Sequence, residues 1–143
     1  MYSFVGAEAL ILLRNVWLIR RPRVPGQLSD NDGWEVRQTD RNPAFKSCPG
    51  HDIWKRDFTG SASVFSFTFV DNVSSKQVET FINALHIFKI GLSWGGVTSL
   101  AVVYPDLVRP NKDFGGRLVR LNIGLEAVDD LINDLELAIS NIN

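Results

Sequence analysis

The feature that most constrains the fold of this 143-residue chain is a switch of hydrophobic period within a short stretch. Phenylalanines alternate with small polar residues over residues 65–69, which predicts a strand with one aromatic face. Over residues 78–85 the apolar spacing becomes that of a helix with one buried stripe. Because each element has a single apolar face, the two are expected to pack against each other. The strand face consists of Phe65, Phe67 and Phe69, and the helical stripe of Val78, Phe81, Ile82 and Leu85.

The boundary between this strand and this helix carries its own signals. Asp71-Asn72 predicts a turn, since both side chains bond readily to nearby backbone. Ser74 followed three residues later by Gln77 is the pattern of a capping box, in which each residue satisfies a free backbone donor of the other. The helix is therefore expected to begin directly after Ser74.

Three further strands are predicted toward the C-terminus. They cover residues 87–90, 97–104 and 117–123. Residues 107–116 hold a proline and two glycines and are expected to form a loop. In the last strand, one face consists of Val119, Leu121 and Ile123 and the other of Leu118, Arg120 and Asn122.

The final helix is predicted to begin after Gly124. Acidic residues at its start suit the positive end of the helix dipole, namely Glu126, Asp129 and Asp130. Its core stripe consists of Val128, Leu131, Ile132, Leu135 and Ile139. The order β-α-β-β-β-α predicts an α+β fold, a small and mostly antiparallel sheet with helices on one face.

Residues 1–41 differ in character from the rest of the chain. The apolar stretch over residues 5–19 is interrupted by charges and is shorter than the ~20 residues of a membrane-spanning helix. We expect instead an amphipathic helix that packs on the body or on a partner through Leu10, Leu13 and Trp17. Residues 20–33 combine arginines with proline and glycine, which favours a solvated connector over a phosphate site. The predicted division is a helix and linker over residues 1–41 and a folded domain over residues 42–143.

Charge and cysteine content exclude several classes of function. The formal charge is −1, with 15 basic and 16 acidic residues, so neither a nucleic-acid nor a membrane partner is expected. Cys48 is the single cysteine, which excludes an intrachain disulfide and suits a cytoplasmic protein. Cys48 and His51 have the spacing of two metal ligands, but no second pair accompanies them. A turn at Pro49-Gly50 is the preferred interpretation, and no metal site is expected.

Two places are candidates for binding chemistry, and each has a purely structural alternative. Arg120 lies mid-strand, opposite the apolar face, where its guanidinium suits a carboxylate; a solvent-facing arginine is the alternative. Ser93-Trp94-Gly95-Gly96 permits close approach of a ligand to the backbone, with the tryptophan as a wall. Its alternative is a tight turn with the tryptophan closing the core. Ser93 has no recognisable base nearby in sequence, so a serine nucleophile is not predicted.

Several stretches resemble one enzyme family, in the same order and over residues 42–139. Residues 48–61, CPGHDIWKRDFTGS, run into FSF at residues 65–67 and resemble the opening of the carboxy-terminal domain of bacterial cystathionine β-lyases. The later matches are SWGG at residues 93–96, LVRLNIGLE at residues 118–126 and VDDLI at residues 128–132. The resemblance identifies the chain with the carboxy-terminal part of a pyridoxal-phosphate enzyme of sulfur amino-acid metabolism.

This resemblance implies a fold and a reaction. The fold is the small α+β domain of the aspartate-aminotransferase-like enzymes, whose cofactor acts as an electron sink during elimination. The reaction converts cystathionine to homocysteine, pyruvate and ammonia, a step toward methionine. The resemblance implies that Arg120 binds the substrate α-carboxylate, Ser93 helps to position the catalytic lysine and Trp94 lines the substrate pocket. Trp94 favours a β-lyase, because related γ-lyases and γ-synthases usually have leucine there.

Departures from the family pattern affect the expected substrate specificity. Leu92 stands where the family often has tyrosine, and Val97-Thr98 stands where it often has a glutamate. The lysines at positions 46, 55, 76, 89 and 112 do not lie in a sequence that resembles the Schiff-base motif. We therefore expect the cofactor domain to be absent from this chain and the isolated chain to be inactive.

The expected partner is a pyridoxal-phosphate-binding domain, in cis or in trans, and a homo-oligomer is also possible. The alternative hypothesis is a non-catalytic interaction domain, or a decayed remnant of such an enzyme. Under the first hypothesis Arg120 and Trp94 face the surface on which the cofactor domain docks. Under the alternative, the helix at residues 5–19 seals that surface or mediates self-association.

Overall fold

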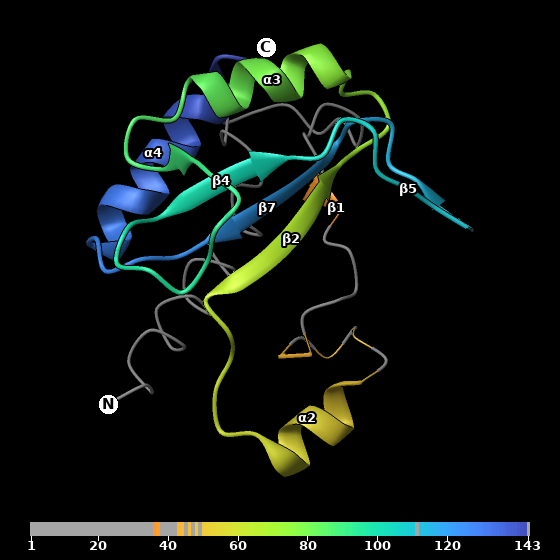
Figure 1. Ribbon diagram of the computed structural model, residues 1–143, viewed down its shortest axis with the longest axis vertical. Helices are drawn as coiled ribbons and strands as arrows, with labels where there is room; N and C mark the ends of the chain where they lie inside the picture. The colour runs from red at the N-terminus through yellow and green to blue at the C-terminus, as the bar shows by residue number, and fades with distance from the viewer. Residues whose placement is uncertain are drawn as a thin grey trace, which may run out of the picture.

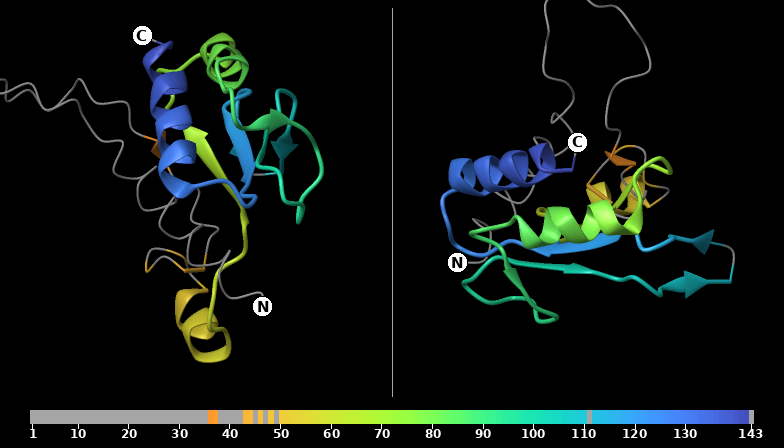
Figure 2. Two further views of the ribbon diagram at one scale, coloured as in Figure 1. Left: turned by 90° about the vertical axis from the view of Figure 1, so that its left-hand side faces the viewer. Right: turned by 90° about the horizontal axis from the view of Figure 1, so that it is seen from above.

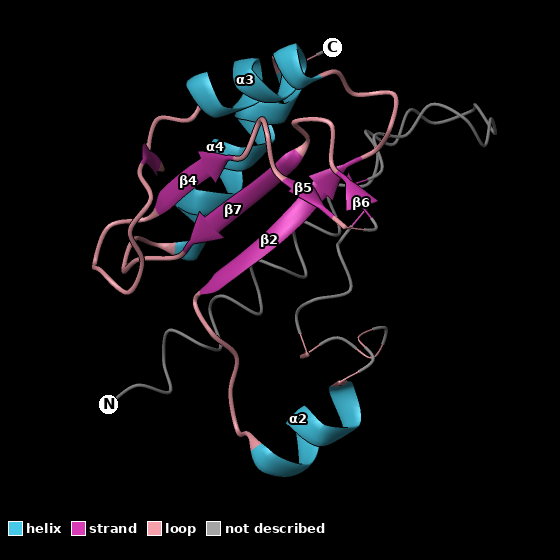
Figure 3. Cartoon of the chain, turned by 45° about the vertical axis from the view of Figure 1, so that its right-hand side comes forward, coloured by secondary structure: helices cyan, strands magenta, loops and turns pink. Residues whose placement is uncertain are grey.

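A computed structural model describes residues 36–37, 43–44, 46, 48, 50–110 and 112–142 of the chain. At its centre is a five-stranded sheet of order β1-β2-β7-β4-β3, and a two-stranded hairpin β5-β6 connects β4 to β7 (Figures 1 and 3). The strands are β1 (Val36–Arg37), β2 (Val64–Phe69), β3 (Lys89–Ile90), β4 (Leu100–Val103), β5 (Val108–Arg109), β6 (Lys112–Asp113) and β7 (Leu118–Asn122). The helices are α2 (His51–Asp57), α3 (Ser75–Asn83) and α4 (Val128–Ser140).

The sheet is mostly antiparallel, as predicted. The pairs β1-β2, β2-β7 and β4-β7 are antiparallel, and only β3 runs parallel to β4. Helices α3 and α4 cover the same face of this sheet (Figure 2). The predicted α+β class is thus confirmed.

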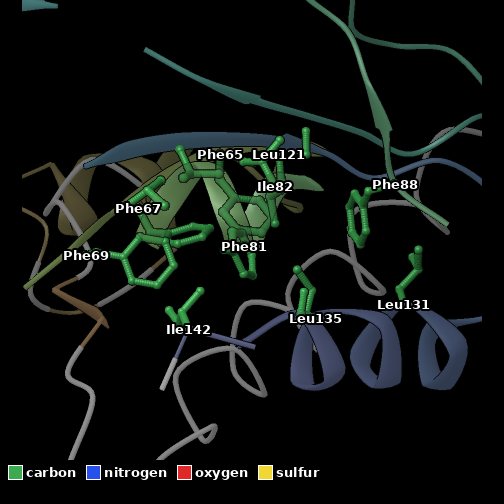
Figure 4. Close-up of a cluster of buried hydrophobic side chains, with 14 of the residues drawn as sticks. Phe65, Phe67, Phe69, Phe81, Ile82, Phe88, Leu121, Leu131, Leu135 and Ile142 are labelled. Carbon is green, nitrogen blue, oxygen red and sulfur yellow. The ribbon is translucent and has the colours of Figure 1, made fainter. Parts of the chain in front are cut away.

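The core lies between the sheet and these two helices (Figure 4). The aromatic face of β2 is buried, and Phe81 of α3 meets two of its rings edge-on, with centroids 6.3 Å from Phe67 and 5.2 Å from Phe69. Such aromatic edge contacts add to the free energy gained from burying the rings. On α4 the predicted stripe also packs on the core, with Leu131 and Leu135 buried.

The predicted capping box is present at the start of α3. The hydroxyl of Ser74 accepts from the Gln77 amide at 3.3 Å, and the Gln77 Oε1 accepts from the Ser74 amide at 3.0 Å. The Nε2 of Gln77 also donates to the carbonyl of Ile142 at 2.9 Å. The cap therefore joins the start of α3 to the end of the chain that follows α4.

Asp134 joins α4 to the segment between α3 and β3. Its side chain is buried, and the residue is only 4% exposed. The two carboxylate oxygens accept from three consecutive backbone amides, those of His86 at 2.8 Å, Ile87 at 2.9 Å and Phe88 at 3.1 Å. The carboxylate satisfies donors that no strand pairs, and so fixes the connection between α3 and β3 against α4.

Some predicted elements differ from the observed ones. Residues 107–116 are not all loop, because they contain the hairpin β5-β6, whose two-residue strands are too short to produce an alternating pattern. The strands predicted over residues 87–90 and 97–104 are shorter, covering 89–90 and 100–103. Helix α2 was not predicted, since none of its residues is buried and it has no apolar stripe to reveal it.

The helix predicted over residues 5–19 lies outside the described residues. Within the described part of the chain, no helix has the length and apolar character needed to cross a membrane.

Candidate functional site

Arg120 lies in the middle of the sheet, on the face turned away from α3 and α4. On one side it pairs with Ser66 of β2 and on the other with Val102 of β4. Directly paired residues of antiparallel strands share a face, so the three side chains form a row across the sheet. The next row along β7 contains Asn122, which is almost completely buried. This face is therefore not simply solvent-facing, because the loop over residues 91–99 and the hairpin cover parts of it.

The guanidinium of Arg120 is held by backbone carbonyls and lies near two aromatic rings. Its Nη2 donates to the carbonyl of Leu92 at 2.5 Å and lies 3.4 Å from that of Ser93. Its Cζ is 5.8 Å from the ring centroids of both Trp94 and Tyr104. A guanidinium at this distance from an aromatic face gains a cation–π attraction. The structure thus brings the predicted residues Arg120, Ser93 and Trp94 together and adds Tyr104.

Ser93 and Trp94 present their side chains to the surface. Trp94 is 67% exposed, so it does not close the core, and that structural alternative for the glycine-rich segment is wrong. Ser93 contributes its carbonyl to Arg120, and its hydroxyl makes no hydrogen bond within the described residues. The exposed ring of Trp94 is therefore available to a second polypeptide or a ligand.

The loop that carries these residues is attached to the end of β7. The Oδ1 of Asn122 accepts from the Gly95 amide at 3.0 Å, and its Nδ2 donates to the Thr98 carbonyl at 3.3 Å. Further along, the Ser99 amide donates to Glu126 at 2.8 Å and the Ser99 hydroxyl donates to it at 2.7 Å. The middle of the loop and its C-terminal end are therefore held by residues that closely follow Arg120.

Glu126 has a different role from the predicted one. Its carboxylate binds Ser99, instead of lying free at the start of α4. Burial by itself would raise the pKa of Glu126, but hydrogen bonds from the amide and hydroxyl of Ser99 and from its own amide outweigh that effect and lower the pKa. Glu126 therefore stays ionised and acts as an acceptor for the loop.

Arg120 also borders a cavity of about 250 Å³ beneath the hairpin. Arg109 of β5 lines the same cavity, and Tyr104 and Ser66 provide hydroxyl-bearing side chains. The remaining lining is apolar and consists of Leu107, Phe114 and Leu118. Two guanidinium groups around one small cavity favour an anion over a cation.

His51 makes its contacts within the segment around α2. The Nδ1 of His51 lies 2.8 Å from the carbonyl of Pro43, and its ring lies beside Trp54 with a centroid distance of 5.7 Å. Among the described residues, no group of three or more metal-ligating side chains lies close together. Instead, Trp54 donates from Nε1 to the carbonyl of Gly60 at 3.1 Å, which ties α2 to the segment before β2.

Comparison with known proteins gives the family. The model of the Cys/Met metabolism PLP-dependent enzymes matches residues 35–140, a stretch that includes β1 and the whole sheet. The chain belongs to this family. The enzymes of this family depend on the cofactor pyridoxal phosphate (PLP).

The relatives of this PLP-family chain include enzymes with different names. It is 40% identical over 107 residues to cystathionine beta-lyase MetC of Escherichia coli, covering 71% of the chain and 27% of the relative. It is 36% identical over 132 residues to the cystathionine beta-lyase of Haemophilus influenzae, covering 88% of this chain and 30% of the relative. It is 35% identical over 104 residues to an L-alanine/L-glutamate racemase of Wolbachia pipientis, covering 70% of this chain and 26% of the relative. The chain thus spans less than a third of the length of these relatives.

A solved structure confirms the fold. Apo CalE6, a methionine gamma lyase from Micromonospora echinospora, superposes with a TM-score of 0.66 at 22% identity, covering 94% of this chain and 31% of that one. At this identity the likeness supports the fold and no particular substrate.

The described residues do not by themselves fit the PLP cofactor. A PLP enzyme binds the cofactor through a lysine amine. Lys46, Lys55, Lys76 and Lys89 are exposed, and none of them lines the cavity beside Arg120. Lys89 instead donates to the carbonyl of His86 at 2.7 Å. We therefore assign no chemical step through the cofactor to these residues.

Proposed function

We propose that this chain is the substrate-carboxylate-binding part of a PLP-dependent carbon–sulfur lyase and that Arg120 binds the α-carboxylate. The observation that carries the proposal is the state of the Arg120 guanidinium. It has no carboxylate partner among the described residues, and its Nη2 is occupied by the Leu92 carbonyl. Arginine carries five N–H donors in a planar fork, and Nη2 carries two of the hydrogens. Leu92 takes one of them, so the second Nη2 hydrogen and a neighbouring N–H on the same edge are left to form two parallel bonds to a carboxylate.

Ser93 and Trp94 complete this carboxylate site in our proposal. The Ser93 hydroxyl makes no hydrogen bond to the described residues and lies next to the carbonyl that Arg120 contacts, and we assign it to positioning the catalytic lysine of a cofactor-bearing domain. Trp94 lies over Arg120 and forms the wall of the substrate pocket. Neither role requires either residue to carry out the elimination itself.

The cofactor-bearing domain, in cis or in trans, is proposed to dock on the exposed apolar edge around this site. The edge consists of Ile90, Leu92, Trp94, Val97 and Leu125, each between 63% and 69% exposed. Large apolar side chains that gather at one edge are typical of an interaction surface. Without that domain the site has no lysine and no cofactor, so the isolated chain is proposed to be inactive. The same edge supports the second candidate, a non-catalytic interaction domain or a self-associating chain.

The proposed reaction is the cleavage of cystathionine to homocysteine, pyruvate and ammonia. The names of the relatives from E. coli and H. influenzae support it. The Wolbachia relative, named as an alanine and glutamate racemase, indicates that binding an amino-acid carboxylate is the more general property. The choice of reaction then depends on the cofactor-bearing part and on the residues around Trp94.

The proposal is tested with a chimera. The matching part of the E. coli cystathionine beta-lyase is replaced by this chain, and pyruvate release from cystathionine is measured for the chimera and for the isolated chain. We expect pyruvate from the chimera only, and about a hundredfold lower kcat/KM after Arg120→Ala, since an unpaired carboxylate loses a charged bidentate contact. Pyruvate formed by the isolated chain in proportion to its concentration would contradict the proposal. A folded, PLP-loaded chimera indifferent to Arg120→Ala would contradict the assignment of Arg120.

A further inference from the structure

We propose that Asn122 is a positioning residue for the loop over residues 91–99. It holds the front half of this loop, residues 91–95, and with it Trp94, against Arg120; residues 96–99 form the back half. Its importance for catalysis rests on the function proposed above. The contacts that carry the inference are independent of that function, because they lie entirely within this chain.

The side-chain amide of Asn122 bridges the two ends of a tight turn. Its oxygen accepts from Gly95 and its nitrogen donates to the carbonyl of Thr98. Gly95 has a φ of +74°, a backbone conformation that suits glycine. Asn122 is 1% exposed, so water does not compete for either bond. One buried amide with both a donor and an acceptor in use therefore fixes the shape of this turn.

The two halves of the loop have different anchors. The back half is held by the segment before α4: the Leu125 amide donates to the Val97 carbonyl at 2.8 Å, and Glu126 accepts from Ser99. The front half is held at its start, where the Gly91 amide donates to the Ala101 carbonyl at 3.2 Å and Arg120 donates to the carbonyls of Leu92 and Ser93. At its other end, the Gly95 amide bonds to Asn122 alone among the described residues. Releasing Asn122 should therefore loosen the loop around Trp94 and Gly95 and leave Ser99 in place.

The front half is the part that contacts Arg120. It supplies the Leu92 and Ser93 carbonyls and the ring of Trp94. Arg120 and Asn122 are two positions apart on β7, so both side chains lie on the same face of the sheet. A single strand thus presents the guanidinium and also the amide that holds the loop over it.

Amide hydrogen exchange and side-chain NMR of the full chain test this inference. In Asn122→Ala, exchange at the Gly95 amide is expected to rise about tenfold, the loss of about one hydrogen bond, while exchange at Ser99 stays within about twofold. The Nε–H signal of Arg120 is expected to lose the ring-current shift caused by Trp94. Glu126→Gln is the matched control and should give the opposite pattern. Amide exchange becomes faster at Ser99 and stays unchanged at Gly95. Unchanged Gly95 exchange and an unmoved Arg120 signal in Asn122→Ala would overturn the inference.

A second measurement needs no variant, in case Asn122→Ala does not fold. In the unsubstituted chain, a scalar coupling across the hydrogen bond is expected between the Gly95 nitrogen and the side-chain carbonyl carbon of Asn122. Its absence from a spectrum that shows the backbone couplings between β2 and β7 would overturn the inference.

The chimera separates this inference from the proposed function. In an active chimera, Asn122→Ala is expected to lower kcat/KM for cystathionine about tenfold, with unchanged PLP content. An inactive parent chimera combined with the expected exchange pattern would refute the proposed function and leave the role of Asn122 in the loop intact. An active chimera in which Asn122→Ala leaves Gly95 amide exchange unchanged would refute the role of Asn122 and leave the proposed function intact.

Discussion

Replacement of Asp134 by alanine is expected to be among the most destabilising single changes in the described domain. The substitution removes the acceptor for the amides of His86, Ile87 and Phe88. These donors lie in the connection between α3 and β3, more than forty residues away in sequence. The change therefore breaks the contact between α4 and this connection without altering the apolar core.

The magnitude follows from the burial of the three donors. Phe88 is buried, so its amide would lose its partner without gaining water, at a cost of about 1.5–3 kcal/mol for a bond to a charged acceptor. His86 is exposed and Ile87 is partly buried, so their amides can reach water and cost about 0.5–1 kcal/mol each. The expected loss of unfolding free energy is about 2.5–5 kcal/mol. Asp134→Asn should cost about half as much, because one oxygen remains to accept.

The assay is equilibrium unfolding in urea followed by far-ultraviolet circular dichroism. The control is Asn133→Ala, a polar neighbour on the exposed side of α4, which should change the unfolding free energy by less than about 0.5 kcal/mol. An Asp134→Ala variant within about 1 kcal/mol of the parent, with an unchanged denaturant slope, would show that the three hydrogen bonds do not stabilise the fold.

Three further predictions concern the site and its loop. Arg120→Lys should lower kcat/KM of the chimera at least tenfold, because an ammonium cannot form two parallel bonds, whereas Arg56→Lys on exposed α2 should not change it. Gly124→Ala should cost about 2–4 kcal/mol in urea unfolding, since a Cβ there overlaps the backbone of the facing loop, whereas Gly60→Ala meets nothing within 4 Å. In the folded chain Glu126 has a pKa below its ordinary value of 4.5, so as the pH falls the unfolded chain binds the proton first. The stability that Glu126 contributes is therefore present above pH 4.5 and is lost as the pH falls through the folded pKa. Glu126→Gln should therefore cost about 1 kcal/mol at pH 7, a difference that shrinks below pH 4.5 in unfolding curves.

The parts of the fold that the sequence predicted are those with one buried face. β2, α3 and α4 each bury one stripe, so their apolar residues recur with the period of the element. Helix α2 and the hairpin β5-β6 lack that property. The helix buries none of its residues, and the paired strands are two residues long. Local composition alone therefore indicated a turn and a loop in these places.

The candidate site was only partly predictable, for a related reason. Arg120, Ser93 and Trp94 were identified through a family resemblance, and alternation placed Asn122 on the same side as Arg120. The contribution of Tyr104 depends on the register of β4 against β7, which no local pattern specifies. The bonds from Asn122 to Gly95 and Thr98 likewise span more than twenty residues of sequence and exist only once the sheet has formed.

The proposed role of Arg120 as the carboxylate anchor is tested directly by chemical rescue. The measurement is pyruvate release from cystathionine by the Arg120→Ala chimera, with and without added guanidinium chloride at non-denaturing concentration. If the missing guanidinium is what binds the substrate carboxylate, the added ion should restore part of kcat/KM in a saturable manner, and the parent chimera should show no such gain. An Arg120→Ala chimera that is folded and PLP-loaded but already fully active, with no response to guanidinium, would contradict the central claim.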